Sequence, residues 1–396
     1  MIRKIIPKKL KELIRQTSFF RKYNNKKRAL RYIRYVVPVK DIDIAVASTQ
    51  NKEAFIDKYS KLWPERIFDF LKHAEGCLKS RGVRSLEIDK DLKREMLFCF
   101  IAYGFSADEF LIYSLLDKSE RERNEYVSDR DLMIMVYKLN DSVEIETFNN
   151  KAKTYSVFKE FYKRDAVGIK MSADFPKFKD FIESRKEVVI KPVGEAMGRG
   201  IELVSTERIR LAAQGFFEDL ISHGEYLIEE KVVQNSAMSE FNESTVNTIR
   251  IITFNIGHEI IIPYCFLKAG RKGSFVDNGG AGGILVGADI KTGVTNTDGI
   301  DENGHAYVNH PDSGKRFKGF QLPDYNSAII LCKKMSSMVS KIRYIGWDLA
   351  YTNNGWIVIE GNGMSQLIGP QATQGRGVKQ EIDEIVKDVK PAWKWL

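Results

Sequence analysis

The chain has 396 residues, of which 43% are hydrophobic and 29% are charged. This composition is typical of a folded protein and excludes an intrinsically disordered one. The sequence contains no run of roughly 18 consecutive apolar residues, the length that a membrane-spanning helix would need. The formal net charge of +9 is unevenly placed: residues 1–40 carry 14 Lys or Arg and one acidic residue, so that the remaining 356 residues have a net charge of −4.

The N-terminus lacks the apolar core and small-residue cleavage site of a signal peptide. The four cysteines are scattered without a CxxC spacing, and we interpret Cys77, Cys99, Cys265 and Cys332 as reduced structural thiols. The five histidines show no ligand spacing, and we expect surface or structural roles for them. Together these features predict a cytoplasmic protein.

Residues 1–40 read as a basic amphipathic arm. Apolar residues recur at helical spacing over residues 5–20, with lysines and Arg15 on the opposite side. Six further basic residues follow, namely Lys22, Lys26, Lys27, Arg28, Arg31 and Arg34. Such a helix can bind the anionic inner face of the cell membrane, or it can be the solvated face of a helix packed on the body. No motif of aromatic and glycine residues indicates nucleic-acid binding.

Residues 41–145 read as a mainly helical domain. Ser106 and Glu109 have the spacing of a capping box at the start of a helix, and only short runs such as Leu132–Tyr137 look like strands. From about residue 185 short apolar runs are separated by glycine-rich turns, which indicates an α+β body with largely antiparallel sheets. We expect strands at Val188–Lys191, Ile201–Val204, Tyr226–Glu229, Ile249–Phe254, Ile260–Tyr264, Ile284–Val286 and Trp356–Ile359, and helices at Arg208–Leu220 and Tyr325–Lys341.

The segment from Gly346 to Asn362 carries the strongest chemical signal. Two apolar runs flank Asn353-Asn354-Gly355, which predicts a hairpin. A three-residue loop centred on Asn354 would place Asp348 opposite Glu360, with Asn362 on the same face. Two opposed carboxylates and an amide oxygen are hard ligands that suit Mg²⁺, whereas a frayed hairpin would leave one carboxylate in solvent.

A second signal is the strand Val188–Lys191 followed by glycines at 194, 198 and 200. The backbone amides of such a loop can approach phosphate groups, and the lysine adds a positive charge. The segment matches neither a Walker A motif nor a Rossmann fingerprint, and an ordinary glycine hairpin explains it equally well.

Two weaker signals follow. The strand beginning at Tyr226 runs into Glu229-Glu230-Lys231-Val232, which is compatible with an adenine-holding hinge or with a charged turn. Arg250 lies inside a β-run, where an arginine usually needs an anionic partner, either a phosphate or a structural carboxylate.

In this order the four elements resemble the ATP-grasp superfamily over residues 147–375. The chain is most similar to the sugar-transfer-associated ATP-grasp proteins of bacterial surface-polysaccharide synthesis. The closer match rests on Gly104–Glu109, Asn150–Thr154, Val276–Gly283 and Gln366–Gly377. The resemblance implies two α+β subdomains that clasp ATP, a lid and nucleotide subdomain at 146–235 and a catalytic subdomain with the metal site at 236–396.

The resemblance also implies roles for individual residues. Lys153, with Lys151 as a competitor, and Lys191 would bind the nucleotide, and Arg250 would steady the transferred phosphoryl group. The other implied nucleotide contacts are Gly194, Gly198, Gly200, Glu229, Glu230, Lys231 and Val232, and the implied Mg²⁺ ligands, for two ions, are Asp348, Glu360 and Asn362. Arg271, Asn278 and Arg376 are candidates for gripping a substrate carboxylate or sugar.

Two features depart from the superfamily pattern. The acid that usually binds ribose has no single counterpart, because Gln234 and Glu240 both fit its place. In addition, the N-terminal part reads as helical, in place of a parallel βαβ pre-domain.

The resemblance implies an ATP- and Mg²⁺-dependent ligase that joins a carboxylate to an amine through an acyl phosphate. One of the two substrates would be a cell-surface glycan or its lipid-linked precursor. The alternatives are a kinase on the same scaffold and a catalytically silent ATP-binding component of a glycan assembly complex.

Overall fold

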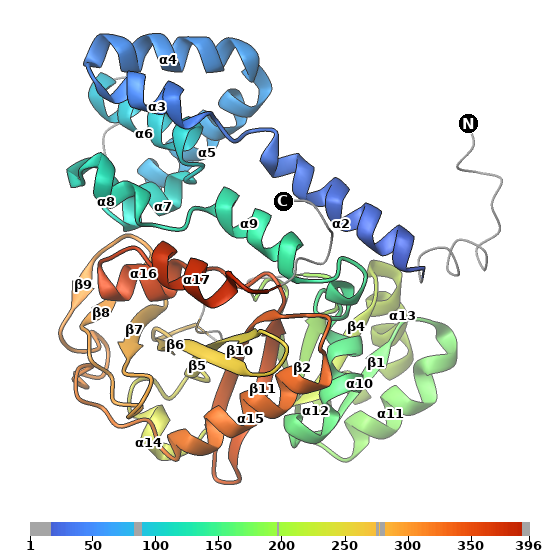
Figure 1. Ribbon diagram of the computed structural model, residues 1–396. Coiled ribbons are helices and arrows are strands. Elements are labelled where there is room, and N and C mark those ends of the chain that lie inside the picture. Colours follow the sequence, from blue (N-terminus) through green and yellow to red (C-terminus); the bar gives the residue numbers. More distant parts are fainter. Residues whose placement is uncertain (1–16, 83–88, 196–197, 275–276, 278–281, 390–396) are drawn as a thin grey trace, which may run out of the picture. The chain divides into compact units, whose positions relative to one another are not determined.

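The computed structural model describes residues 17–82, 89–195, 198–274, 277 and 282–389 (Figure 1). The chain forms two compact units, which we call the helical unit and the sheet unit. The helical unit contains Met1–Ser142, Ile300–Ala306 and Gln366–Leu396, and the sheet unit contains Val143–Gly299 and Tyr307–Ser365. The division at residue 235 between a lid and a catalytic subdomain stays a prediction.

The helical unit buries one large apolar core among its helices. Its elements are α2 Ser18–Ile33, α3 Val39–Val46, α4 Thr49–Leu62, α5 Pro64–Ser80, α6 Lys90–Ala102, α7 Ala107–Ile112, η2 Leu115–Asp117, α8 Glu120–Asn124, α9 Asp129–Leu139, α16 Ile368–Gln374 and α17 Lys379–Val386. None of the described helices is both long enough and apolar enough to cross a membrane. The expectation of a mainly helical N-terminal region is confirmed.

Two local predictions in this unit have opposite outcomes. The capping box at Ser106 and Glu109 is confirmed, since each side chain bonds the backbone N–H of the other. The strand expected at Leu132–Tyr137 is wrong, because these residues lie in α9, whose N-cap Ser128 accepts a hydrogen bond from the backbone of Asp131. The apolar residues of this run fit the two-residue spacing of a strand as well as the spacing of a helix. The N-cap and the two acidic residues in the first turn favour the helix.

The amphipathic helix expected over residues 5–20 lies mostly outside the described residues. Thr17 is the N-cap of α2, and its hydroxyl accepts a hydrogen bond from the backbone N–H of Phe20 at 3.2 Å. Five of the six residues of the basic cluster lie on α2, and the sixth, Arg34, is its C-cap. Asn25 and Ala29 of α2 are buried, and the Asn25 amide donates to the carbonyl of Asn140 at 2.7 Å, so α2 packs within the helical unit.

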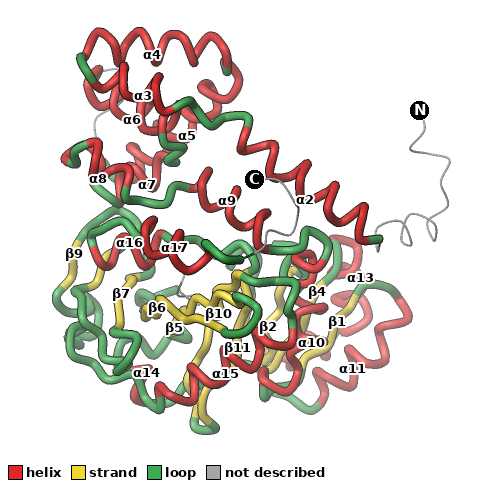
Figure 2. The backbone as a smooth tube through the Cα atoms, viewed as in Figure 1, coloured by secondary structure: helices red, strands yellow, loops and turns green. Residues whose placement is uncertain are grey.

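The strands, which Figure 2 shows in yellow, belong to the sheet unit except for Ile300 of β8 and Ala306 of β9, which fall in the helical unit. A four-stranded antiparallel sheet has the order β1-β4-β2-β3, from β1 Ala166–Ile169, β2 Glu187–Pro192, β3 Glu202–Ser205 and β4 Tyr226–Glu230. A seven-stranded sheet has the order β11-β10-β5-β6-β7-β8-β9, from β5 Thr248–Asn255, β6 Ile260–Ala269, β7 Ile284–Ala288, β8 Gly299–Ile300, β9 Ala306–Tyr307, β10 Tyr344–Thr352 and β11 Gly355–Asn362. All the pairings resolved residue by residue are antiparallel. The predicted α+β class with antiparallel sheets is thus confirmed.

Helices pack on both sheets. The remaining elements are η3 Glu144–Thr147, α10 Lys151–Tyr162, η4 Ser172–Asp174, α11 Phe175–Glu183, α12 Thr206–Arg210, α13 Ala213–His223, α14 Ser236–Ser239 and α15 Tyr325–Met338. Aromatic residues of α11 and α13 form an apolar core with the four-stranded sheet, and α15 packs on β5 and β6. The single helix expected at Arg208–Leu220 is two helices, and α15 ends three residues before the expected Lys341. Because α10 contacts β1, β4 and β11, it spans both sheets.

Candidate active site

The hairpin β10–β11 places Asp348 directly opposite Glu360. This pairing was expected from a three-residue loop centred on Asn354. In the structure Thr352 pairs with Gly355, so the turn has only two residues. A register shift then lets Leu349 face Val358, which leaves Ile359 as an extra residue on β11. This β-bulge restores the pairing that a three-residue loop would have produced.

Asp348 is buried and bound by two cations. Arg250 on the neighbouring strand β5 donates from Nε and Nη2 to the two carboxylate oxygens, both at 2.6 Å. Lys268 on β6 adds a third contact at 3.3 Å. Burial alone would raise the pKa of Asp348, but Arg250 and Lys268 outweigh burial and hold the pKa below its usual value. Asp348 therefore stays ionised.

Glu360 has the opposite electrostatic setting. Burial, and next the nearby charge of Asp348, raise the pKa of Glu360, while Lys151 acts in the other direction. In the described part of the chain no group donates a hydrogen bond to this carboxylate. A carboxylate held beside another one without a donor of its own favours a proton or a bound cation.

The donor set fits Mg²⁺. Asn362 lies two residues beyond Glu360 on β11, and its buried amide Nδ2 has no hydrogen-bond partner among the described residues. Mg²⁺ prefers oxygen ligands, and the Glu360 carboxylate, which receives no hydrogen bond from the described residues, offers them, while the unpartnered Asn362 nitrogen is itself no ligand. Asp348 would share its oxygens with Arg250 and Lys268.

On the four-stranded sheet, Lys191 of β2 and Glu229 of β4 form an ion pair. Lys191 Nζ lies 2.8 Å from Glu229 Oε2, and Arg164 Nη2 lies 2.8 Å from the same oxygen. Glu229 is only 2% exposed. Burial works to raise the pKa of Glu229, but the two cations outweigh it and lower the pKa. The Glu229 side chain thus holds Lys191 at the cavity wall.

Of the two lysines considered as the first nucleotide contact, Lys151 lines the cavity and Lys153 does not. Residues two apart on a helix point about 200° apart, so the two side chains of α10 face opposite ways. Lys151 lines the cavity and donates to the carbonyls of Pro192, at 3.1 Å, and Glu195. Lys153 is exposed and is not among the cavity residues.

One cavity within the sheet unit is bordered by groups from both sheets and from α10, whereas Arg250 and Asn362 are not among its lining residues. Its charged lining residues are Lys151, Lys191, Lys268, Glu195, Glu229, Glu230, Asp277, Asp348 and Glu360. Its apolar lining residues are Phe148, Val189, Ile201, Val232, Val246 and Ile359. The cavity therefore combines a charged region suited to phosphates and cations with apolar surface suited to a flat ring.

Three lining residues were missed by sequence reasoning. Lys268 is buried and lies 3.2 Å from Asp277, whose carboxylate also accepts hydrogen bonds from the backbone and hydroxyl of Thr248. Lys268 could have been found from the sequence, because it ends an apolar run that reads as a strand, and a buried lysine needs a carboxylate or a ligand as its partner. Asp277 lies in Val276–Gly283, one of the segments on which the family resemblance rests. No neighbouring residue in the sequence indicates that its partner is Lys268.

The glycine loop reaches the cavity through Gly198, which has φ +74°. Gly200 has φ +68°, and a Cβ there would lie 2.9 Å from Pro192, so a larger residue would clash. Gly194 is exposed with open space around it.

Of the predicted hinge, Glu230 and Val232 line the cavity. The Glu230 carboxylate is engaged by Arg185 at 2.7 Å, and Lys231 pairs with Glu187 at 2.8 Å. These two side chains thus make ion pairs, and the role of the segment as an adenine-holding hinge stays a prediction.

Neither ribose candidate lines the cavity. The Gln234 amide bonds the backbone of Asn242, Thr245 and Asn247, which makes it a structural residue. Glu240 pairs with Lys315.

Each of the two described substrate candidates pairs with a carboxylate of its own unit. Arg271 pairs with Asp312 at 2.9 Å, and Arg376, in the helical unit, pairs with Glu381 at 2.5 Å. Asn278 lies outside the described residues. Salt bridges with neighbouring carboxylates thus account for both arginines.

Comparison with known protein families identifies the family to which the chain belongs. The family model described as "Sugar-transfer associated ATP-grasp" matches residues 134–387, which is more than half of the chain. No protein of curated function matches the chain.

Several solved structures are similar at low sequence identity. The ATP-grasp ligase PsnB, complexed with a minimal precursor, has 11% identity and a TM-score of 0.41, with 70% of this chain and 72% of that one covered. D-alanine–D-alanine ligase from Helicobacter pylori has 14% identity and a TM-score of 0.38, with 61% of both chains covered. L-amino acid ligase from Bacillus licheniformis has 15% identity and a TM-score of 0.35, with 57% of this chain and 43% of that one covered. At these scores the similarities say nothing about the reaction of this chain.

Proposed function

The chain belongs to the sugar-transfer associated ATP-grasp family, and on this premise we propose that it is an ATP- and Mg²⁺-dependent carboxylate–amine ligase. The observation that carries the proposal is the charge arrangement of the cavity. Lys151 and Lys191 border the cavity together with Glu360, whose carboxylate receives no hydrogen bond from the described residues. Cations for a triphosphate and a carboxylate for a metal ion thus face the same space.

Each group has a defined task in this proposal. Lys151 and Lys191 bind the phosphates of ATP, and the backbone from Glu229 to Val232 and the apolar lining hold the adenine. Glu360 and Asn362, with Asp348, hold Mg²⁺, which neutralises charge on the transferred phosphoryl group. Arg250 is fixed by Asp348 and, although it does not line the cavity, its positive charge acts on Glu360.

The reaction has two balanced steps. A carboxylate oxygen of the first substrate attacks the γ-phosphorus of ATP, and the bond to ADP breaks, which gives an acyl phosphate. The amine of the second substrate then attacks the acyl carbon, phosphate leaves, and the nitrogen loses a proton to give the amide. Positioning and charge neutralisation supply most of the catalysis in phosphoryl transfer, which is consistent with a site that lacks an obvious nucleophilic side chain.

We also propose that one substrate is a membrane-bound glycan precursor, and α2 supports this. Phe19 is 82% exposed and Tyr23 is 54% exposed. On the same helix the basic residues Lys22, Lys26, Lys27 and Arg31 are exposed, as is the C-cap residue Arg34. Aromatic and basic residues on one exposed helix surface are typical of peripheral contact with anionic lipid.

Substrate pools test the reaction. The purified chain is incubated with Mg²⁺-ATP and pooled carboxylates and amines, and phosphate release and product masses are recorded. A ligase gives a product equal to both substrates minus one water, and release requires both pools. A product heavier by one phosphate unit would identify a kinase. Release that stays at background with every pair would favour a silent ATP-binding component.

A matched pair of variants tests the membrane contact. Replacing Lys22 and Lys27 by Gln should weaken binding to anionic vesicles, measured by sedimentation, about 30-fold, since each cation near such a surface contributes about 1 kcal/mol and about 1.4 kcal/mol corresponds to a tenfold change. The control replaces Lys58 and Lys61 of α4, which pair with Asp41 and Asp57. Equal binding by both variants would contradict the role of α2. Deletion of residues 1–35 is unsuitable, because it would remove the buried Asn25 and Ala29.

A further inference from the structure

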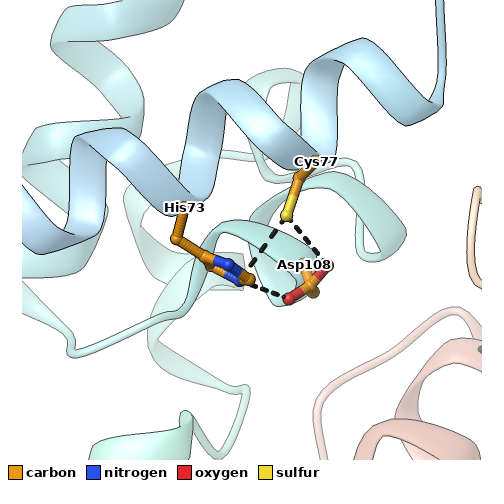
Figure 3. A group of neighbouring side chains, drawn as sticks. All are labelled: His73, Cys77 and Asp108. Atoms are coloured by element: carbon orange, nitrogen blue, oxygen red, sulfur yellow. Dashed lines mark hydrogen bonds and ion pairs between the residues drawn. The ribbon is translucent and has the colours of Figure 1, made fainter.

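Three side chains of different chemistry converge in the helical unit. His73 and Cys77 lie on α5, and Asp108 lies in the first turn of α7 (Figure 3). His73 Nε2 is 2.8 Å from Asp108 Oδ2, Cys77 Sγ is 3.1 Å from Asp108 Oδ1, and Cys77 Sγ is 3.5 Å from His73 Nε2. All three side chains direct a potential ligand atom at the same point, and none belongs to the ATP cavity.

Local structure holds this cluster in place. His73 and Cys77 are four residues apart, which puts them on the same face of α5. The capping box of Ser106 and Glu109 fixes the start of α7 and with it the position of Asp108. The expectation that the histidines lack ligand spacing is wrong for His73, whose partner four residues on is a cysteine.

The geometry is not that of a nucleophilic triad. In a Cys-His-Asp relay the two ring nitrogens contact different partners, one the thiol and the other the carboxylate. Here the same nitrogen, Nε2 of His73, approaches both Cys77 and Asp108, and the thiol donates directly to the carboxylate. A proton relay through the ring therefore has no path.

The same distances fit a tetrahedral metal site. With metal bonds of about 2.3 Å to sulfur and about 2.0 Å to nitrogen and oxygen, tetrahedral ligand atoms lie about 3.3–3.6 Å apart. The Cys77–His73 separation of 3.5 Å already falls in this range, whereas Asp108 lies 2.8 Å from His73 and 3.1 Å from Cys77, so its carboxylate would have to move outward by a few tenths of an ångström. We propose that His73, Cys77 and Asp108 form a mononuclear site for a Zn²⁺-like transition-metal ion that ties α5 to α7.

Burial and ligand type define which ion fits. Cys77 is 8% exposed, whereas the His73 and Asp108 side chains are 57% and 49% exposed, so an ion can enter from solvent and keep water as its fourth ligand. Thiolate and imidazole are softer ligands than Mg²⁺ or Ca²⁺ prefer, and they suit Zn²⁺ and its neighbours. Binding displaces the thiol proton of Cys77 to solvent and uses the neutral imidazole of His73.

Co²⁺ as a spectroscopic substitute tests the site. The full chain, reduced and with excess Mg²⁺ in the cavity, is titrated with Co²⁺. We expect one ion per chain, a thiolate-to-metal charge-transfer band, and visible bands with the intensity of tetrahedral coordination. Added Zn²⁺ should displace Co²⁺ and remove the bands. Absence of the charge-transfer band in the folded wild-type chain would overturn the proposal.

Variants assign the ligands. Cys77→Ser should abolish the charge-transfer band, and His73→Ala should weaken Zn²⁺ binding by at least about tenfold, because even outer-sphere changes cost about 10–100-fold in metal affinity. Asp69→Asn is the matched control, since this exposed carboxylate lines the same surface depression outside the cluster. A band that persists in Cys77→Ser, or equal losses in Asp69→Asn and His73→Ala, would refute the assignment.

Thermal unfolding gives an independent readout. Zn²⁺ should raise the melting temperature of the wild-type chain and of Asp69→Asn, but not of His73→Ala, because only a ligand that binds the folded state stabilises it. Glu360→Gln should retain the Zn²⁺ effect, which separates this site from the ATP cavity. A Zn²⁺ effect of equal size in His73→Ala would count against the proposal.

Discussion

Glu229 and Glu360 border the same cavity from different sheets, and they differ in the charges beside them. Glu229 is fully buried and is neutralised by Lys191 and Arg164, so that its pKa is lowered in spite of burial. Glu360 stands beside Asp348, whose cations are already engaged, and its pKa is raised by burial and by that negative charge. The comparison indicates that the four-stranded sheet contributes a completed ion cluster, whereas the seven-stranded sheet contributes a carboxylate that still lacks a counter-charge.

The largest effect is expected for Glu360→Gln. Loss of this carboxylate should reduce Mg²⁺-ATP-dependent phosphate release by more than about 100-fold, since even outer-sphere changes at metal sites cost about 10–100-fold. The fold should be retained, because the variant removes a negative charge next to Asp348. Phosphate release and circular dichroism measured on the same preparation check this. Wild-type turnover in the variant would remove Glu360 from the proposed metal site.

The reverse pattern is expected for Glu229→Gln. This change leaves Arg164 and Lys191 buried without their counter-charge, which should lower the free energy of unfolding by about 3–5 kcal/mol. Denaturant titration measures the loss, with Glu360→Gln as the control that should show none. If both variants lost the same stability, the two carboxylates would not differ in the way described.

The buried Glu109 extends the comparison to the helical unit. Burial raises the pKa of Glu109 to about 8, against about 4.3 in the unfolded chain. Between these two pH values the Glu109 carboxyl is protonated in the folded chain and ionised in the unfolded chain. The free energy of unfolding therefore falls as the pH rises through this range, by at most about 1.4 kcal/mol per pH unit. Glu109→Gln preserves the capping box and should remove this part of the slope. Unfolding free energies measured from pH 5 to about 8 compare the two chains, and parallel curves would contradict the assignment.

The smallest effect distinguishes two lysines of α10. Lys151→Met should raise the KM for ATP about tenfold, corresponding to about 1.4 kcal/mol, because Lys151 lines the cavity and acts on Glu360. Lys153→Met should leave the KM unchanged, since that side chain is exposed. Steady-state kinetics with varied ATP decides between them. The opposite ranking would restore the sequence-based choice of Lys153.

The sequence alone determined the features that depend on a few neighbouring residues. Short apolar runs between glycine-rich turns predicted most strands of the sheet unit. Ser106 and Glu109 predicted a helix start, and the hairpin turn predicted that Asp348 and Glu360 face each other. Hydrogen bonds and side-chain periodicity act over a few residues, so such features can be derived locally. The predicted pairing of Asp348 with Glu360 was correct, but for a different reason. A two-residue turn and a bulge at Ile359 take the place of the expected three-residue loop.

Only the tertiary structure decided which charges meet. Arg250 binds Asp348 across 98 positions of sequence, Lys268 joins Asp277 and Asp348, and Asp108 reaches Cys77 from another helix. Such pairs depend on strand order and helix packing, which bring distant residues together, and no local pattern encodes the partner. Burial then sets the consequence, since removing water makes each unmatched charge costly and leaves Glu360 in need of a cation.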